Sequence, residues 1–352
     1  MILKAASEAL GEQLTEPVEL SRGRSTVVRC RDNRGGTLIV KSYAAAEDFA
    51  AEASGLELAS RGPRLLAVDA DRALIVMTDL GNAPSLAGLL LGDDADAARA
   101  GLFQWARGLG QLARGAHGRR AELNALRRRY GLDPSSLQEV NFPLRHVRKL
   151  GERLAGVGIT PPDGLDADIA DIAKLENDGY PGFSPGDTCP DNNLLTASGL
   201  QLLDFEDSGF PSVFLTAVYC RMPFPSCWCS FRLEPSLAGA VEEAFRTELL
   251  PVYPDLGDDR LWHAGVRRAV GAWTASTMLL FPEALAGDRK LNGRGGPSPT
   301  VRQLMVHRCT ELRRELAPVG ELPALAETAA LLLERAAKEW RTPPLPPFPA
   351  FA

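Results

Sequence analysis

The sequence predicts an α+β protein with two lobes, a small β-rich N-terminal lobe and a larger, mostly helical C-terminal lobe. Up to about residue 80, short apolar segments alternate with turn signals, a pattern typical of strands. Beyond that point most apolar residues recur at helical spacing. A chain of 352 residues can bury a large core and is long enough for two lobes. We therefore expect residues 1–80 to form an antiparallel sheet with one helix, and residues 81–352 to form the second lobe.

Composition restricts the partners of the chain. The apolar fraction of 45% and the charged fraction of 24% are ordinary for a globular protein. A formal net charge of -6 argues against nucleic acid as the main partner. The sequence has no N-terminal signal region and no apolar run long enough to span a membrane, so we expect a cytoplasmic protein without a membrane partner. It would act as a monomer or a homodimer.

Five segments of the N-terminal lobe predict strands, and one segment predicts a helix. The helix is expected over residues 47–60, because Phe49, Ala53 and Leu56 fall near one face. The turn over residues 21–25, which ends at Ser25, could offer backbone N–H groups to phosphates. The expected strands cover residues 18–20, 25–30, 37–43, 64–68 and 73–78.

Lys41 is the only charged residue in its apolar strand. A lysine at such a position needs an anionic partner. Three glutamates of the following helix are candidates, namely Glu47, Glu52 and Glu57. The alternative is a lysine on an edge strand, where its charge discourages aggregation.

The most informative segment of the chain covers residues 183–207. Asp187 follows Gly186, which permits a tight turn, and Asn192 comes five residues later. Residues 194–203 predict a hairpin that returns Asp204 to the same place. The alternative is a polar surface loop followed by an unrelated aspartate.

This set of side chains is what a phosphoryl transferase needs. One carboxylate orients the attacking hydroxyl and accepts its proton, while an asparagine and a second carboxylate hold magnesium. At these residues the chain resembles the aminoglycoside phosphotransferase family, small-molecule kinases with a protein-kinase-like fold. The matching residues are Gly186, Asp187 and Asn192, followed by Asp204, Phe205, Glu206 and Asp207. Two family residues differ, since Pro185 stands in place of a histidine and Leu215 in place of an aspartate.

The resemblance implies an enzyme that uses ATP and Mg²⁺ to phosphorylate a hydroxyl group of a small-molecule acceptor. It implies that Asp187 is the catalytic base and that Asn192 and Asp204 hold the metal. Lys41 would anchor the phosphates with Glu52 as its partner, since Glu52 precedes Leu56 as in the family pattern E-x3-L. Residues 78–81 resemble the family hinge that contacts adenine. The remaining nucleotide contacts expected are therefore Ser25, Thr78 and Leu80.

The acceptor cannot be chosen from the sequence. Family members act on aminoglycosides, choline, homoserine or fructosamines, and the fold does not discriminate among them. The residues expected to contact the acceptor are Glu206, Asp207, Tyr219, Arg221 and Trp228. The alternative function is a pseudokinase that binds nucleotide or serves as a scaffold, which Pro185 and Leu215 suggest and which the retained catalytic residues oppose.

The second lobe is expected to be helical outside the hairpin. Two basic stretches, residues 119–120 and 127–129, are typical of a solvated helix face, with contact to an anionic ligand as the alternative. Cys227 and Cys229 form a C-x-C pair without a second pair or a histidine cluster, which favours packing over metal binding. The proline-rich residues 342–352 cannot form an α-helix. Helices are expected near residues 94–114, 166–176, 235–249, 258–281, 300–317 and 322–340.

Overall fold

The computed structural model describes residues 2–22, 25–136, 142–219, 221–222, 224–225, 227–293 and 297–352. The chain is α+β as expected, with a small antiparallel sheet and a larger set of helices. It divides into two compact units, here called the sheet unit and the helical unit. The sheet unit comprises Met1–Gly88, Arg107–Glu139 and Gly182–Phe210. The helical unit comprises Leu89–Ala106, Val140–Pro181 and Pro211–Ala352.

The sheet unit therefore contains more than the N-terminal residues 1–80 from which we expected the first lobe. Its additional segments carry the predicted catalytic loop and the helix α5, Arg120–Arg129, which packs against α2, Ala46–Leu58. Sequence pattern alone did not indicate these contacts, because they join segments far apart in the chain.

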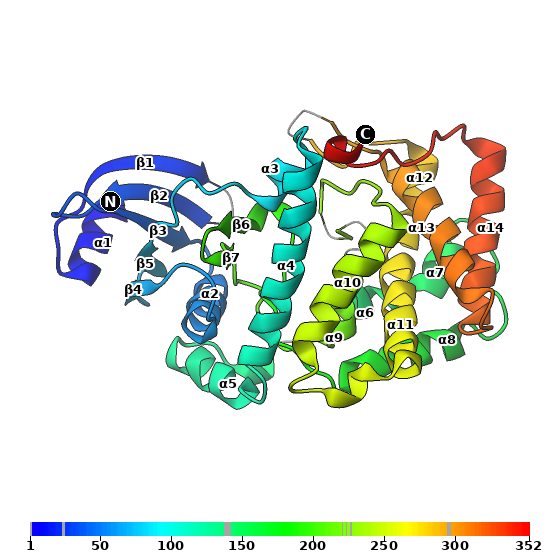
Figure 1. Cartoon of the computed structure of the whole chain (residues 1–352), viewed down its shortest axis with the longest axis horizontal. Coiled ribbons are helices and arrows are strands. Elements are labelled where there is room, and N and C mark those ends of the chain that lie inside the picture. Colours follow the sequence, from blue (N-terminus) through cyan, green and yellow to red (C-terminus); the bar gives the residue numbers. More distant parts are fainter. Residues whose placement is uncertain are drawn as a thin grey trace. The chain divides into compact units, whose positions relative to one another are not determined.

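The five expected strands form one antiparallel sheet in the order β1-β2-β3-β5-β4 (Figure 1). Lys41 lies on β3, which pairs with β2 on one side and β5 on the other. The edge-strand interpretation of Lys41 is therefore wrong. The strands are β1 Thr15–Arg22, β2 Ser25–Arg31, β3 Thr37–Tyr43, β4 Leu65–Asp69 and β5 Leu74–Thr78.

Alternation along β3 separates the two faces of the sheet. Leu38 and Val40 join the apolar cluster that packs against α1, Ile2–Leu10, a helix that the sequence analysis did not predict. Lys41 and Tyr43 lie on the opposite face of the strand and contact α2, as expected for a side-chain period of two. Lys41, the one charged residue of β3, therefore lies on the face that packs against α2.

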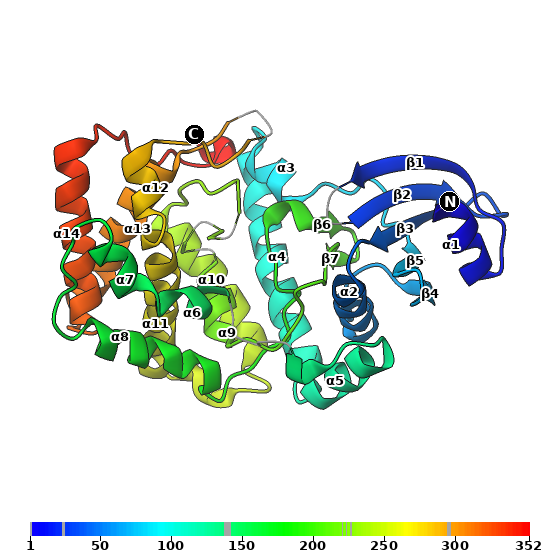
Figure 2. The same cartoon turned by 180° about the vertical axis from the view of Figure 1, so that it is seen from behind.

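The predicted hairpin is present in the sheet unit as β6, Asn193–Thr196, and β7, Gly199–Leu202. In the helical unit the long helix α11, Asp259–Met278, packs against several others (Figure 2). These are α6 Phe142–Val147, α8 Leu165–Ala173, α9 Val213–Ala217 and α13 Val301–Leu316, and α13 in turn packs against α14 Pro323–Glu339. No helix in the described part of the chain is long and apolar enough to cross a membrane. The C-terminal segment is extended, buries Phe348 and ends in the short 3-10 helix η5, Pro349–Phe351.

The helices not yet bounded are α3 Leu86–Leu90, α4 Ala95–Gly115, α7 Leu150–Ala155, α10 Pro235–Leu249 and α12 Phe281–Ala286. The six helices expected after residue 80 are present as α4, α8, α10, α11, α13 and α14, whereas α3, α6, α7, α9 and α12 were not expected. The short 3-10 segments are η1 Pro134–Ser136, η2 Lys174–Asn177, η3 Pro190–Asn192 and η4 Pro254–Gly257.

Candidate active site

The loop that carries Asp187 is held closed at its base by backbone pairing. Ser184 and Gly209 exchange two hydrogen bonds, of 2.9 and 3.0 Å. Between them Gly186 adopts a φ of 92°, which favours glycine. A Cβ at this position would lie 2.3 Å from the carbonyl oxygen of Asp207, so the two backbone segments could not approach as they do. Gly186 is therefore required both by its conformation and by its neighbour.

Asp187 is oriented by the loop that follows it. Its Oδ1 accepts a hydrogen bond of 2.9 Å from the Cys189 N–H, and its Oδ2 lies 3.5 Å from Nδ2 of Asn192. The fully buried Asn193 donates through Nδ2 to the carbonyl oxygens of Thr188 and Cys189, at 3.2 and 2.5 Å. The sequence analysis did not identify Asn193, although it adjoins the predicted metal ligand.

The register of the hairpin brings the backbone of Asn192 beside the residue that precedes Asp204. Asn193 pairs with Leu202 across the two strands, and the Leu203 N–H donates to the Asn192 carbonyl oxygen at 3.0 Å. Asp204 is the next residue after this pair. The hairpin thus returns the chain to the Asp187 loop, as its length predicted.

Lys41 forms the centre of a buried charge cluster with Glu52 and Asp204. Its Nζ lies 3.0 Å from Oε2 of Glu52 and 3.2 Å from Oδ1 of Asp204. Lys41 is 6% exposed and Glu52 is 0% exposed. Oε2 of Glu52 also accepts a hydrogen bond of 3.2 Å from the Phe205 N–H. This side chain therefore fixes both the lysine and the backbone beside Asp204.

The other two glutamates of α2 do not pair with Lys41. Glu57 instead binds Arg129 and the hydroxyl of Tyr130. Glu47 is exposed in the first turn of the helix.

Burial and neighbouring carboxylates shift the pKa values of these groups. Burial, reinforced by repulsion from Asp191, Asp204 and Asp207, raises the pKa of Asp187 to about 6. Burial would lower the pKa of Lys41, but attraction to Glu52 and Asp204 outweighs it and the pKa is raised. Burial would raise the pKa of Asp204, but attraction to the charged Lys41 and the hydrogen bond that Lys41 donates lower it. Lys41 is therefore charged and Asp204 is ionised at neutral pH.

Three carboxylates of the sheet unit could hold a divalent cation. Oxygen atoms of Glu52, Asp204 and Glu206 lie within 4.8 Å of one another. Carboxylate oxygens are ligands that Mg²⁺ prefers. Two of these three carboxylates, those of Glu52 and Asp204, also pair with Lys41. The donor set fits magnesium, and it adds Glu206 to the predicted ligands Asn192 and Asp204.

The predicted nucleotide contacts differ in whether their backbone groups already form hydrogen bonds within the protein. The N–H and Oγ1 of Thr78 are both hydrogen-bonded to the backbone of Arg64, at 3.0 and 2.9 Å. Leu80 follows β5, and within the described residues its backbone N–H and carbonyl make no hydrogen bond. Ser25 begins β2, whereas the adjoining Gly23 and Arg24 of the phosphate-turn prediction lie outside the described residues. Leu80 is thus the better of the two hinge candidates.

The predicted acceptor contacts belong to both units. Glu206 and Asp207 lie in the sheet unit, and Tyr219, Arg221 and Trp228 lie in the helical unit. Asp207 is exposed, and Glu206 and Trp228 are half-buried.

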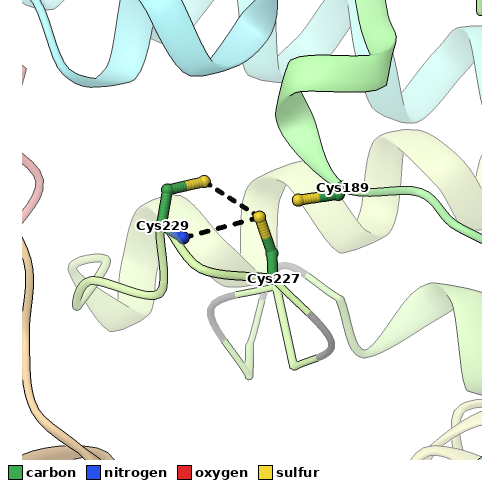
Figure 3. A group of neighbouring side chains, drawn as sticks. All are labelled: Cys189, Cys227 and Cys229. Carbon is green, nitrogen blue, oxygen red and sulfur yellow. Dashed lines mark hydrogen bonds between the residues drawn. The ribbon is translucent and has the colours of Figure 1, made fainter. Parts of the chain in front are cut away.

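Tyr219 has a packing role in the helical unit. It is 4% exposed, and its ring meets that of Trp273 edge-on at 5.3 Å. Nearby in sequence, Cys227 and Cys229 are both buried, and their sulfur atoms are 3.1 Å apart (Figure 3).

Arg127 supports the segment after Asp204, which the sequence analysis did not anticipate. It is buried, and its Nη2 donates to the Ser208 carbonyl oxygen at 2.6 Å, so it does not belong to a solvated helix face. Arg120 of the same helix donates to the Phe210 carbonyl oxygen at 2.8 Å. Helix α5 therefore holds the backbone of the segment that follows Asp204, at Ser208 and Phe210.

Comparison with known proteins identifies the fold. No protein-family model matches this chain, and no curated sequence matches it. A solved choline kinase from Cryptosporidium parvum superposes with a TM-score of 0.51 at 10% identity, covering 90% of this chain and 93% of that one. An aminoglycoside phosphotransferase from Alicyclobacillus acidocaldarius gives 0.48 at 14% identity, with 95% and 97% covered. A macrolide 2'-phosphotransferase from Brachybacterium faecium gives 0.44 at 18% identity, with 97% of each chain covered.

These structures are small-molecule phosphotransferases with a protein-kinase-like fold. At such low identities the similarity establishes the fold, and it rests on the choline kinase. The resemblance inferred from the Asp187 loop and the hairpin is confirmed at that level.

Proposed function

We propose that this chain is an ATP-dependent small-molecule kinase. The observation that carries the proposal is the buried Lys41, which lies between Glu52 and Asp204 in the same unit as the Asp187 loop. A buried ion cluster is a poor way to stabilise a fold, because apolar residues of similar volume would serve as well or better. Phosphate transfer requires a cation and carboxylates of this kind, together with a loop that carries an aspartate and an asparagine, as Asp187 and Asn192 do here.

Each residue would have a distinct role in the reaction. Asp187 would orient the acceptor hydroxyl and take its proton as the hydroxyl oxygen attacks the γ-phosphorus and the bond to the departing ADP oxygen breaks. A pKa of about 6 leaves this carboxylate ionised at neutral pH while keeping it a useful base. Lys41 would bind oxygens of the α- and β-phosphates, and Glu52 would hold Lys41 in place.

Asp204, Asn192 and Glu206 would hold Mg²⁺, which when bound neutralises the negative charge of the phosphates. Leu80 would present its backbone groups to adenine, beside Thr78. Ser25 would lie at the phosphate end of the nucleotide. These assignments depend on the kinase proposal and share its test.

The acceptor would be a small-molecule alcohol, such as an aminoglycoside, another antibiotic-like compound or a metabolite. The named acceptors of the similar structures differ widely, and one fold can serve many of them. Glu206 and Asp207 would attract a cationic acceptor, and Trp228 would suit a ring-bearing group, whereas Arg221 is already paired with Glu242 and Glu315. Tyr219 would shape that side of the site through its packing.

The test is transfer of labelled γ-phosphate from ATP to a library of aminoglycosides, macrolides, choline, ethanolamine and fructosamines. The full chain should label at least one acceptor, and the Asp187→Asn variant should be slower by about 10²–10⁴-fold. A chain that binds no ATP would contradict the proposal. Nucleotide binding without transfer to any acceptor would instead favour the pseudokinase, for which Pro185 is the motivating residue.

A further inference from the structure

The helical unit contains a cavity whose lining includes one predicted acceptor contact, Arg221, and none of the residues proposed to bind nucleotide, bind metal or act as the base. Its volume is about 420 Å³, and its wall is built from α10, α11, α13 and the chain that follows α9. The wall combines apolar side chains, among them Met222 and Val270, with four arginines and two glutamates. A volume of roughly 300–1,000 Å³ is usual for sites that bind small molecules.

Two of the cavity's arginines are neutralised by glutamates. Nε of Arg221 lies 2.5 Å from Oε2 of Glu242, and its Nη1 lies 2.5 Å from Oε1 of Glu315. Arg314 pairs with Glu311 on the same helix. These side chains therefore add little net charge to the cavity.

The other two arginines have no such partner. Within the described part of the chain, neither Arg232 nor Arg308 forms an ion pair with a carboxylate. Arg232 is exposed, whereas Arg308 is 3% exposed. His307 reports the resulting positive potential, because burial and the charges of Arg308, Arg232 and Arg314 lower its pKa to about 4. The cavity wall is therefore cationic.

One edge of the Arg308 guanidinium is unused. Its Nη1 donates to Oγ1 of Thr277 at 2.5 Å, but its Nε and Nη2 are buried without a hydrogen-bond partner among the described residues. These two atoms lie on the edge that binds two oxygens of one anion. Arg267 uses that same edge for both oxygens of Glu321, at 2.7 and 2.5 Å. Arg308 thus keeps two unused donors beside the cavity; they have almost no accessible surface in this structure, so an oxyanion would reach them when the guanidinium turns toward the cavity.

This arrangement is costly for the free protein. A buried cation without a counter-charge is unfavourable, and burial lowers the pKa of Arg308 to about 9. An apolar side chain of similar length would fill the same space without this cost. An anion entering the cavity would supply the missing charge and the missing hydrogen-bond acceptors.

We propose that this cavity binds a small organic molecule through a carboxylate or phosphate group, which Arg308 and Arg232 hold while the apolar part of the molecule lies on Met222 and Val270. The inference goes beyond the kinase proposal and does not depend on it, because binding needs neither nucleotide nor turnover.

The test uses the full chain without nucleotide, with benzoate and phenyl phosphate as charged probes and benzamide as the uncharged counterpart of benzoate. Calorimetry should show at least one charged probe binding about tenfold more tightly than benzamide, because hydrogen bonds from a guanidinium to an anionic oxygen are stronger than those to a neutral amide. The tighter of the two charged probes identifies the preferred anion. Binding should be unchanged in Asp187→Asn, which separates this result from the kinase proposal.

Three variants locate the site. Arg308→Met should abolish binding of the charged probes and raise the melting temperature of the free protein, because it removes an uncompensated buried charge. Arg232→Ala should weaken binding by about three- to tenfold. Arg313→Ala is the matched control, an exposed arginine on the same helix but outside the cavity wall, and should bind as the wild type does.

Arg232→Ala carries the test alone if Arg308→Met does not fold. The proposal is overturned if no charged probe binds, if benzamide binds equally well, or if the cavity variants bind as tightly as Arg313→Ala.

Discussion

Replacing Asp187 with asparagine should both impair catalysis and stabilise the protein at neutral pH. Asparagine keeps an oxygen that can accept the hydrogen bond from the Cys189 N–H, so the loop geometry should survive. It removes the carboxylate that would accept the acceptor's proton, and it removes a negative charge crowded by Asp191, Asp204 and Asp207. Opposite effects on activity and stability are the signature of a residue kept for function.

The size of the stability effect follows from the pKa of Asp187. Folding raises that pKa from its ordinary value of 3.8 to about 6. One pKa unit corresponds to about 1.4 kcal/mol, so the ionised carboxylate costs the native state at most about 3 kcal/mol. Because the side chain is partly exposed, we expect about 1–2 kcal/mol.

The sign of the pH dependence is fixed by the direction of this shift. A carboxyl group with a raised pKa in the folded state favours folding while it is protonated, below about pH 4, and this contribution is lost as the pH rises through about 6. The asparagine variant does not titrate there. It should therefore exceed the wild type in stability most at about pH 8, by about half as much at about pH 5, and not at all below about pH 4.

Urea denaturation at several pH values measures this difference, and single-turnover phosphate transfer measures the loss of activity, which should be about 10²–10⁴-fold. Asp71→Asn is the control, because Asp71 is exposed in the turn between β4 and β5 and should affect neither quantity. A stability difference that does not change with pH would refute the electrostatic reasoning. Turnover near that of the wild type would refute the assignment of Asp187 as the base.

Further predictions concern the metal, the loop and the acceptor. Asp204→Ala should abolish the Mg²⁺ dependence of ATP binding, which calorimetry with and without the metal would detect; an unchanged dependence would contradict the proposed ligand set. Gly186→Ala should destabilise the fold by roughly 1–3 kcal/mol and abolish activity, because its Cβ would collide with the Asp207 backbone at a φ that favours glycine. Gly209→Ala, whose Cβ would meet nothing within 4 Å, is the control for urea denaturation, and equal losses in the two variants would refute the steric argument. If the acceptor is cationic, Asp207→Asn should raise its KM more than that of ATP and reduce the salt dependence of acceptor binding; equal changes in both KM values would refute a specific contact between Asp207 and the acceptor.

Local sequence determined the sheet and the site residues that lie close together in the chain. Strand alternation around Lys41 predicted β3, because each side chain of a strand takes one face or the other regardless of its distant neighbours. Gly186, Asp187 and Asn192 came from the motif, and the length of the hairpin was enough to return Asp204 to them. These features depend on the backbone preferences of a few consecutive residues.

Only the tertiary structure decided which distant groups meet. Glu47, Glu52 and Glu57 were equivalent as helix residues, and packing of α2 against the sheet and the Phe205 segment selected Glu52. The basic stretch ending at Arg129 gave no sign that Arg127 is buried, because periodicity shows that a helix has two faces but not what covers them. The same limit hid the Arg308 cavity, whose charge balance depends on which arginines find a glutamate in three dimensions. Contacts between residues far apart in sequence are set by the packing of whole elements, and local patterns carry no record of that packing.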